Sequence, residues 1–412
     1  MLFRSPDGKL YVYGSRDEST EYWCSWDHPV LSTSDLVHWQ VTRDAFSTRG
    51  ANDQVAYSDN FLYAPDCQYR EGLYYLYYCL SGGGLNEGVA TSTSPLGPFI
   101  NGKAIDLNGI NMIDPCVFID DDGQAYYIWG QFNAKMARLK PNMIEIDKST
   151  IRDNVVTEKE HYFHEGGYMV KRQGIYYFVY AHMGRAGMPT CLGYATSRSP
   201  MGPFTYGGVI IDNDHCDPGN WNNHGSLVEF KGRWYVFYHR SSHGGMMMRR
   251  TCIEPVHFNA DGSIDEVEMT SQGAAGPLDA FSRIEAERAC LLYGNARLQA
   301  FTDDNEMLTG LVKGDKAAFK YIDFGQSATG CTMRIAPGAA AGKIDIALDN
   351  SWAPAIGSLQ IGGNGDGKTW MNFDCRIKET KGVHAVWLRF NAPAGASFNV
   401  DWFTFKAKNG SN

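Results

Sequence analysis

One short unit, a turn followed by an aromatic strand, recurs five times in this chain and constrains its fold more than any other feature. In each copy a glycine takes the second turn position and a strand rich in tyrosine follows it; the glycines are Gly8, Gly72, Gly123, Gly174 and Gly232. A turn of this kind between two apolar runs favours positive φ and a tight reversal. The fullest copy, residues 113–132, is therefore predicted to be a β-hairpin.

The copies follow one another at intervals of about 50–60 residues. Repetition of one turn-and-strand unit over this distance is typical of a radial β array, in which each unit builds one blade. The sequence therefore predicts an all-β fold with a five-bladed β-propeller over residues 1–270. A two-sheet sandwich is the alternative, and it is less favoured because it does not require the repetition.

Composition narrows the range of partners. The chain has 412 residues and a formal net charge of −9, and it contains no basic run, so neither nucleic acid nor an anionic membrane is an expected partner. No apolar stretch approaches the ~20 residues that a membrane span needs. Aromatic residues make up 13% of the chain, which suits β-blades and also sugar-binding surfaces.

The length predicts two or three domains. Residues 271–279 have the composition of a linker, since a run of Ser, Gly, Ala and Pro opens there. After it, short alternating strands and Gly-rich turns predict a β-sandwich of the jelly-roll type over residues 280–412. The predicted domains are thus 1–270 and 280–412.

The cellular location stays open. The ten cysteines are scattered without a Cys-x-x-Cys pair, which favours reduced thiols, and the first residues lack the anatomy of a signal peptide. Both features favour the cytoplasm for the chain as printed. A chain truncated at its N-terminus would instead fit a secreted or periplasmic protein.

Three polar residues occupy the same point of the repeat, shortly before a hairpin turn: Asp114, Glu165 and His224. Equivalent strand ends converge on the axis of a propeller, so we expect these side chains to meet in a central depression. Two carboxyls that face one cleft can divide the work of glycoside hydrolysis, one protonating the leaving oxygen while the other activates water. Each residue alone has a structural explanation, as a turn acid, a loop acid and a framework histidine. Their coincidence at equivalent positions favours function.

These motifs resemble glycoside hydrolase family 43, whose members are inverting enzymes on five-bladed propellers. The resemblance rests on residues 113–115, 163–167 and 224–228, and on Ala64-Pro65-Asp66. It implies that Glu165 is the general acid and that Asp114 orients this acid and tunes its pKa. It also implies that His224 lies on the axis, where many members hold a calcium ion or waters, and that Arg250 contacts substrate, with a register uncertain by one residue.

The general base of that family is an Asp-Pro about ten residues before the first aromatic strand. Here that strand begins at Leu10, and counting back reaches Met1 without finding the motif. We therefore expect the base to belong to a segment upstream of Met1 that this sequence lacks, through truncation or a start codon assigned too late. The other explanation is a chain that is inactive as a hydrolase. Asp17 and Asp27 come after the strand. On the loop that follows, Trp23 is expected to contact sugar, since an indole can stack on a sugar ring.

Residues 280–407 resemble a family 6 carbohydrate-binding module. The matching parts include residues 284–287, 314–319, 382–388 and 399–402. In that family an early acidic pair and a late aspartate hold a structural calcium, so Glu285, Glu287 and Asp401 are the candidate ligands, and oxygen ligands of this kind suit a hard cation. Leu311 stands where the family has a sugar-binding ring, while Trp370 is either the other ring or a core residue. Weak glycan binding and a structural role are therefore both open.

Together these inferences predict an inverting glycosidase that removes a terminal pentose from oligo- or polysaccharides of the arabinoxylan or arabinan type. An α-L-arabinofuranosidase is the first expectation and a β-xylosidase the second. A catalytically impaired glycan-binding protein is the alternative, and a purely structural propeller is a weaker third. Calcium is the expected ion in the sandwich, a second ion near His224 is left open, and no organic cofactor is implied.

Overall fold

The computed structural model describes residues 2–4, 7–185, 187–213, 221, 223–302, 305–394 and 398–408, with backbone alone for residues 2–4. These residues form two compact units. Unit 1 consists of Met1–Asn213, Trp221–His239 and Met247–Glu268, and unit 2 takes in Arg240–Met246 and Met269–Asn412. Strands dominate both units, and the α-helix of the described part, α1 (Glu158–His161), has a single turn.

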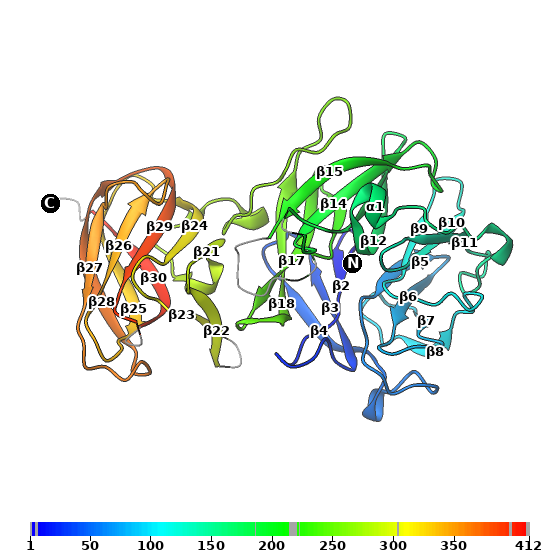
Figure 1. Cartoon of the computed structure of the whole chain (residues 1–412), viewed down its shortest axis with the longest axis horizontal. Helices are drawn as coiled ribbons and strands as arrows, with labels where there is room; N and C mark the ends of the chain where they lie inside the picture. Colours follow the sequence, from blue (N-terminus) through cyan, green and yellow to red (C-terminus); the bar gives the residue numbers. More distant parts are fainter. Residues whose placement is uncertain are drawn as a thin grey trace. The chain divides into compact units, whose positions relative to one another are not determined.

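Within its described residues, unit 1 contains five separate sheets, each of three or four strands in chain order. In Figure 1 these sheets, coloured from blue to green, lie around a common centre. Their strands are β1 (Leu2–Arg4), β2 (Leu10–Tyr13), β3 (Asp27–Thr33) and β4 (Gln40–Ser47); β5 (Asp66–Arg70), β6 (Leu73–Cys79), β7 (Glu87–Ser92) and β8 (Ile100–Ala104); β9 (Cys116–Ile119), β10 (Ala125–Trp129) and β11 (Lys135–Arg138); β12 (Phe163–Arg172), β13 (Ile175–His182), β14 (Cys191–Ser197) and β15 (Thr205–Asp212); and β16 (Ser226–Phe230), β17 (Arg233–Ser242) and β18 (Gly245–Val256).

The predicted hairpin over residues 113–132 is confirmed, because β9 and β10 pair antiparallel with Tyr126 opposite Phe118. All five repeated glycines have positive φ, between 74° and 88°. At three turns the preceding residue is left-handed too, with φ of 52° at Glu71, 51° at Gln173 and 50° at Lys231. Two successive positive φ angles match the twist of paired strands and close the tightest hairpins.

The repeated aromatic strands supply the contacts between neighbouring sheets. Tyr77 of β6 and Tyr127 of β10 are fully buried, and their ring centroids lie 5.9 Å apart. Asp66, at the start of β5, accepts a hydrogen bond of 2.6 Å from the backbone N–H of Val117 in β9. Burial raises the pKa of this carboxyl to about 6. Asp66 of the Ala-Pro-Asp motif thus ties one sheet to the next.

Unit 2 is a curled sheet whose strands follow the order β19-β24-β29-β26-β27-β28-β25-β30-β23-β22 in the described part of the chain. Its halves enclose one apolar core that includes Phe319, Leu388 and Phe403. The strands are β19 (Leu278–Asp279), β20 (Ile284–Glu285), β21 (Leu291–Tyr293), β22 (Arg297–Thr302), β23 (Asn305–Thr309), β24 (Lys316–Asp323), β25 (Ala328–Ala336), β26 (Gly342–Leu348), β27 (Gly357–Ile361), β28 (Met371–Thr380), β29 (Val383–Asn391) and β30 (Asn399–Ala407).

The segment expected as a linker, residues 271–279, makes regular contacts with unit 2. The backbone N–H of Ser271 bonds to the carbonyl of Lys320, and β19 pairs parallel with β24 through Leu278 and Ile322. Among the described residues, none of the helices is long and apolar enough to span a membrane.

Candidate active site

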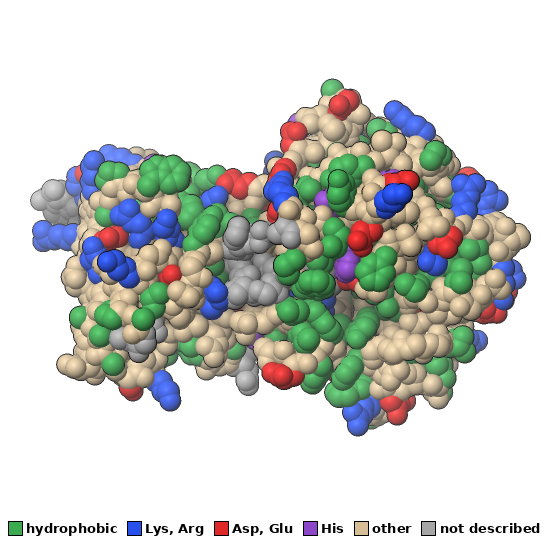
Figure 2. Space-filling view, in the orientation of Figure 1, with side chains coloured by type: hydrophobic (Ala, Val, Ile, Leu, Met, Phe, Trp, Pro, Cys, Tyr) green, Lys and Arg blue, Asp and Glu red, His purple; other side chains and the backbone are tan. Residues whose placement is uncertain are grey.

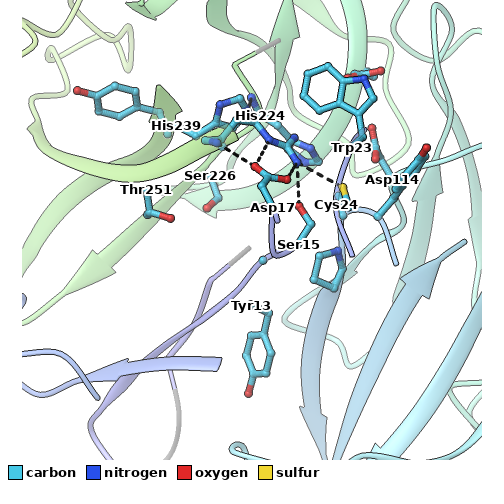
Figure 3. Close-up of a pocket in the computed structure, with 18 of the residues that line it drawn as sticks. Tyr13, Ser15, Asp17, Trp23, Cys24, Asp114, His224, Ser226, His239 and Thr251 are labelled. Carbon is cyan, nitrogen blue, oxygen red and sulfur yellow. Dashed lines mark hydrogen bonds and ion pairs between the residues drawn. The ribbon is translucent and has the colours of Figure 1, made fainter. Parts of the chain in front are cut away.

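One cavity in unit 1 brings together the residues that the sequence singled out in this part of the chain. It has a volume of about 310 Å³, and its lining includes Trp23, Asp114, Glu165, His224 and Arg250. Figure 3 shows Trp23, Asp114 and His224 around this pocket, together with Asp17 and Cys24. The roles given to these residues stay predictions, whereas their convergence on one cavity is a structural finding.

Glu165 lies near the start of β12, where the pairing with β13 is irregular on both sides of Glu165. A bulge of this kind changes the direction in which a side chain points. Gln131 donates a hydrogen bond of 2.7 Å to Glu165 Oε2, and His164 Nε2 lies 3.8 Å from the same oxygen. Gly166 has φ of +66°, and a Cβ there would lie 2.7 Å from the ring of His224. The glycine thus lets Glu165 and His224 approach the same space.

Asp114 is buried, and its backbone is left-handed with φ of 61°, an uncommon conformation for a residue other than glycine. Burial raises the pKa of its carboxyl well above the usual range, and the nearby carboxylates of Glu165 and Glu87 raise it further. Arg249 and the backbone N–H of Gly166 oppose this shift. Asp114 therefore keeps its proton at a pH at which an isolated aspartic acid would have lost its own.

The loop that carries Asp114 is fastened to the start of β7 through Met112. Glu87 of β7 accepts a hydrogen bond of 3.0 Å from the N–H of Met112, and Asn86 donates one of 2.5 Å to its carbonyl. Tyr127 of β10 donates its hydroxyl to the other oxygen of Glu87, at 2.7 Å. Burial raises the pKa of Glu87 to about 7, against these hydrogen bonds, which lower it. Glu87 thus positions the Asp114 loop without lining the cavity.

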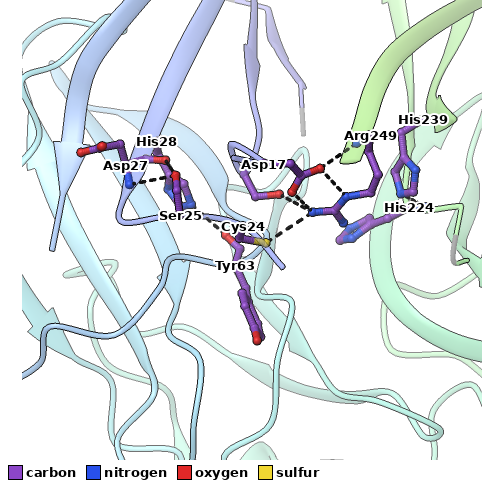
Figure 4. A network of polar contacts seen from close by, with 10 residues as sticks. Asp17, Cys24, Ser25, Asp27, His28, Tyr63, His224, His239 and Arg249 are labelled. Atoms are coloured by element: carbon purple, nitrogen blue, oxygen red, sulfur yellow. Dashed lines mark hydrogen bonds and ion pairs between the residues drawn. The ribbon is translucent and has the colours of Figure 1, made fainter. Parts of the chain in front are cut away.

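A buried ion pair forms another wall of the cavity. Arg249 of β18 contacts both carboxylate oxygens of Asp17, with Nε 2.8 Å from Oδ2 and Nη2 2.6 Å from Oδ1. The same guanidinium also reaches Ser15 Oγ and Cys24 Sγ, at 3.2 and 3.3 Å. Figure 4 shows Arg249 between Asp17 and Cys24. The Trp23 ring faces this group, with 4.9 Å from Arg249 Cζ to the ring centroid. Trp23 therefore lies on the cavity wall, stacked on a fixed cation.

Arg249 and Arg250 both line the cavity, so the one-residue uncertainty in register concerns two real candidates. Beside them, the backbone N–H of His224 donates to Nε2 of His239 at 3.1 Å. Burial lowers the pKa of His224 to about 3, and the charge of Arg249 also lowers it. A second ion near His224 stays a prediction.

The lining of the cavity, as far as the structure describes it, includes three acids: Asp17, Asp114 and Glu165. Asp17 is committed to Arg249. Asp27, the other acid considered for a base, does not line the cavity, and its side chain lies 3.6 Å from Arg16. The described lining therefore holds Asp114 and Glu165 together with an Asp17 that is paired with Arg249.

The acids expected to hold calcium lie in unit 2, and arginines neutralise two of them. Arg283 lies 2.6 Å from Glu285 and 3.5 Å from Asp401, and Arg334 lies 3.4 Å from the other oxygen of Asp401. Within the described ranges, no group of three or more His, Cys, Asp or Glu side chains could hold a metal ion. Arginines thus supply positive charge to Glu285 and Asp401, while Glu285 Oε2 is buried without a hydrogen-bond partner among the described residues. Calcium, with Glu285, Glu287 and Asp401 as its ligands, stays a prediction.

The sugar-binding role of unit 2 also stays a prediction. Leu311 is fully buried in the apolar core, so it offers no surface for a sugar ring. Trp370 is partly exposed and packs against Phe301, with ring centroids 4.9 Å apart. Arg334 lies above the same indole at 5.9 Å. Trp370 is thus part of a surface cluster and not a core residue.

Two features of this site are not apparent from the sequence. Arg249 is the arginine held by Asp17, which lies 232 positions earlier in the chain, so no local pattern reveals the pair. Glu87 stands in Asn86-Glu87-Gly88, directly before an apolar strand, and a carboxyl there reads as a strand-end acid. Its full burial is the signal that identifies it, and burial becomes visible only in three dimensions.

Family models match both parts of the chain. The family model described as "Glycosyl hydrolases family 43" matches residues 3–264, and the model "Carbohydrate binding module (family 6)" matches residues 285–407. An arabinoxylan arabinofuranohydrolase of Paenibacillus polymyxa is 26% identical over 98% of this chain and 72% of its own length. The arabinoxylan arabinofuranohydrolase of Bacillus subtilis (strain 168) is 29% identical, over 91% of this chain and 82% of its own.

Solved structures give the same grouping. A crystal structure of a family 43 arabinoxylan arabinofuranohydrolase from Bacillus subtilis, in complex with cellotetraose, has a TM-score of 0.55 at 26% identity and covers 99% of this chain and 95% of its own. A β-xylosidase/α-arabinofuranosidase from a compost metagenome, in complex with xylotriose, has a TM-score of 0.55 at 28% identity, covering 65% of this chain and 93% of its own.

The elevated pKa of Glu87 predicts how stability depends on pH. Between its ordinary pKa of 4.5 and about 7, the folded chain holds a proton that the unfolded chain releases. Stability should therefore fall as pH rises through this window, by up to about 1.4 kcal/mol per pH unit for one group. Glu87→Gln should make the fall in melting temperature between pH 4.5 and 7 shallower. Glu71→Gln, at an exposed acid, is the matched control; equal slopes in all three proteins would contradict the assignment.

The arginine pairs in unit 2 predict that chelation has no effect on stability. Since Arg283 and Arg334 already supply positive charge to Glu285 and Asp401, EGTA should leave the melting temperature unchanged, as should added calcium. Arg283→Gln should lower it, and Arg376→Gln, at an exposed position on β28, should not. A drop on chelation that calcium reverses would instead show that the acids bind the ion.

Proposed function

The chain belongs to glycoside hydrolase family 43, and from this premise we propose that it releases a terminal pentose from a hemicellulose-derived glycan. The observation that carries the proposal is the pair of buried carboxyls, Asp114 and Glu165, in one cavity of about 310 Å³. A pocket of this size is at the small end for ligand sites, which favours one sugar ring over a long segment of polymer.

Glu165 is the proposed general acid, which protonates the oxygen of the leaving group. Asp114 stands beside it and is held largely in the protonated form by burial and by neighbouring carboxylates. A protonated Asp114 adds no negative charge to the cavity and can donate a hydrogen bond. Gln131, which donates to Glu165 Oε2, fixes the direction of the acid. Trp23, His224 and Arg250 are the proposed contacts for the pentose.

An α-L-arabinofuranoside is the first choice of substrate and a β-D-xyloside the second. The order follows the relatives that match nearly the whole chain, which are described as arabinoxylan arabinofuranohydrolases. Shorter relatives are described as β-xylosidase or xylosidase/arabinosidase. The proposed partner is therefore an arabinoxylan- or arabinan-type saccharide. In this proposal each of the five sheets of unit 1 is a blade, and unit 2 is a jelly roll.

The second half of the proposed hydrolysis needs a general base that activates water. We propose that this base lies outside the described lining of the cavity. Asp17 is the acid available by position, but its two oxygens are engaged by Arg249. Releasing Asp17 would leave a buried guanidinium without its counter-charge, which is costly. A chain with an intact acid and no base would bind the pentose and turn it over slowly, so a catalytically impaired glycan-binding protein is the second candidate function.

Glu165→Gln tests the acid. Gln cannot donate a proton to the leaving oxygen, so turnover of pentosides with poor leaving groups should fall by about 10²–10⁴-fold. Pentosides with activated leaving groups, such as dinitrophenyl, need less assistance and should lose less. Glu158→Gln, at an exposed acid of α1, should leave both rates unchanged. Equal, small losses for both classes of substrate would remove Glu165 from this role.

Sodium formate tests the base. A small carboxylate that diffuses into the cavity can replace a missing general base, so formate should accelerate hydrolysis by the chain at least about tenfold. Asp17→Asn should show the same response to formate as the unaltered chain, with a lower melting temperature from the lost ion pair. If Asp17 were the base, formate would leave the unaltered chain unaffected and would rescue Asp17→Asn.

A further inference from the structure

Two cysteines of unit 2 face each other across neighbouring strands, and the proposed hydrolysis uses neither of them. Cys331 lies in β25 and Cys375 in β28, and the two are direct partners in the antiparallel register of these strands. They are 44 positions apart in the sequence. Figure 1 shows β25 and β28 side by side in unit 2. Residues directly opposite one another in such a pair point to the same face of the sheet, where their side chains meet.

Both side chains point toward the apolar core of the unit. Cys331 is fully buried in that core, and Cys375 packs against it while part of its surface stays exposed. Side chains alternate along β28, so Cys375 and Ile377 face inward whereas Asp374 and Arg376 face solvent. The register of two long strands, of 9 and 10 residues, therefore holds the two thiols together.

The two thiols interact, and the interaction makes them unequal. The hydrogen bond from Cys331 lowers the pKa of the Cys375 thiol, although partial burial opposes the shift. Burial raises the pKa of Cys331 well above its usual range, and the neighbouring Cys375 raises it further. A thiol that is partly exposed and has a lowered pKa supplies the thiolate that attacks other sulfur atoms. Cys375 is thus placed as the attacking thiol and Cys331 as the second thiol behind it.

An oxidant can reach this pair from solvent through Cys375. Among the described cysteines, Cys252 and Cys375 are partly exposed and the others are buried. Figure 2 shows Lys and Arg side chains on the visible face of unit 2. Positive charge on a surface attracts anions, so an anionic oxidant such as oxidised glutathione is drawn to this unit.

We propose that Cys331 and Cys375 form a disulfide when the folded chain meets a small disulfide such as oxidised glutathione. The Cys375 thiolate attacks one sulfur of the oxidant, which forms a mixed disulfide and releases one glutathione thiolate. Cys331 then loses its proton and attacks the Cys375 sulfur, so that the protein disulfide forms and the second glutathione thiolate leaves. Two protein thiols are oxidised, one glutathione disulfide is reduced to two thiols, and the two protons pass to them.

The bond links strands that are neighbours in space and distant in sequence. The loop that it closes contains β26 and β27, and closing a long loop restricts the unfolded chain more than the folded one. The disulfide therefore stabilises unit 2 where the surroundings are oxidising, since such bonds persist there. The inference concerns unit 2 alone and does not rest on the proposed function.

Peptide mapping after oxidation tests the cross-link. The folded chain is incubated with oxidised glutathione, free thiols are alkylated in denaturant, and the digest is read by mass spectrometry. We expect a linked pair of peptides that joins Cys331 to Cys375 and that dithiothreitol separates. Alkylation of both cysteines, or a glutathione adduct that stays on Cys375, would overturn the proposal.

A second measurement reports the effect of the bond on unit 2. Cys290 is fully buried in this unit, so the temperature at which its thiol becomes open to alkylation marks the unfolding of unit 2. Oxidation should raise this temperature by at least about 5 °C, and dithiothreitol should reverse the rise. An oxidised, cross-linked chain that unfolds at the temperature of the reduced chain would contradict the stabilising role.

Variants assign the effect to the pair. Cys375→Ser, at a partly exposed position, should abolish both the linked peptides and the rise, and Cys331→Ala should do the same from the buried side. Cys252→Ser, at the other partly exposed cysteine, is the matched control and should keep both in full. A rise of equal size in Cys375→Ser would show that another cysteine responds and would overturn the assignment. None of these readouts depends on turnover of a glycoside, so this inference and the proposed function fail separately.

Discussion

The centre of unit 1 depends on carboxyl groups that are held out of water by donors from neighbouring sheets. Glu87 in β7 receives the hydroxyl of Tyr127 in β10, and Asp66 in β5 receives the N–H of Val117 in β9. Asp114 receives the N–H of Gly166, in β12. A buried carboxyl without such donors would cost several kcal/mol. The hydrogen bonds that position these acid groups therefore also hold neighbouring sheets together.

The pair of Asp17 and Arg249 links the first and last sheets, as these carboxyls link the other sheets. Asp17 follows β2 and Arg249 lies in β18, so the contact joins the two ends of unit 1. Because both charges are shielded from solvent, each needs the other, and removing one partner leaves a buried charge behind. The same contact stacks Trp23 on the guanidinium and so shapes the wall that the proposed pentose would meet.

Much of this architecture was predictable from the sequence, because the repeat is local. The Gly turns predicted the hairpins, and equivalent repeat positions predicted that Asp114, Glu165 and His224 meet in one cavity. What escaped prediction depends on contacts distant in sequence: the partner of Asp17, the burial of Glu87, and the arginines beside Asp401. An acid looks the same in a sequence whether an arginine, a metal ion or water faces it.

The most direct test of the account is ¹H NMR of the chain with an aryl α-L-arabinofuranoside and an aryl β-D-xyloside, side by side, with formate present. The spectra report both the rate of release and the anomer that forms first. The account predicts release of the pentose with inverted configuration, faster from the arabinofuranoside. Release with retained configuration, or no release from either substrate by a folded chain, would contradict it.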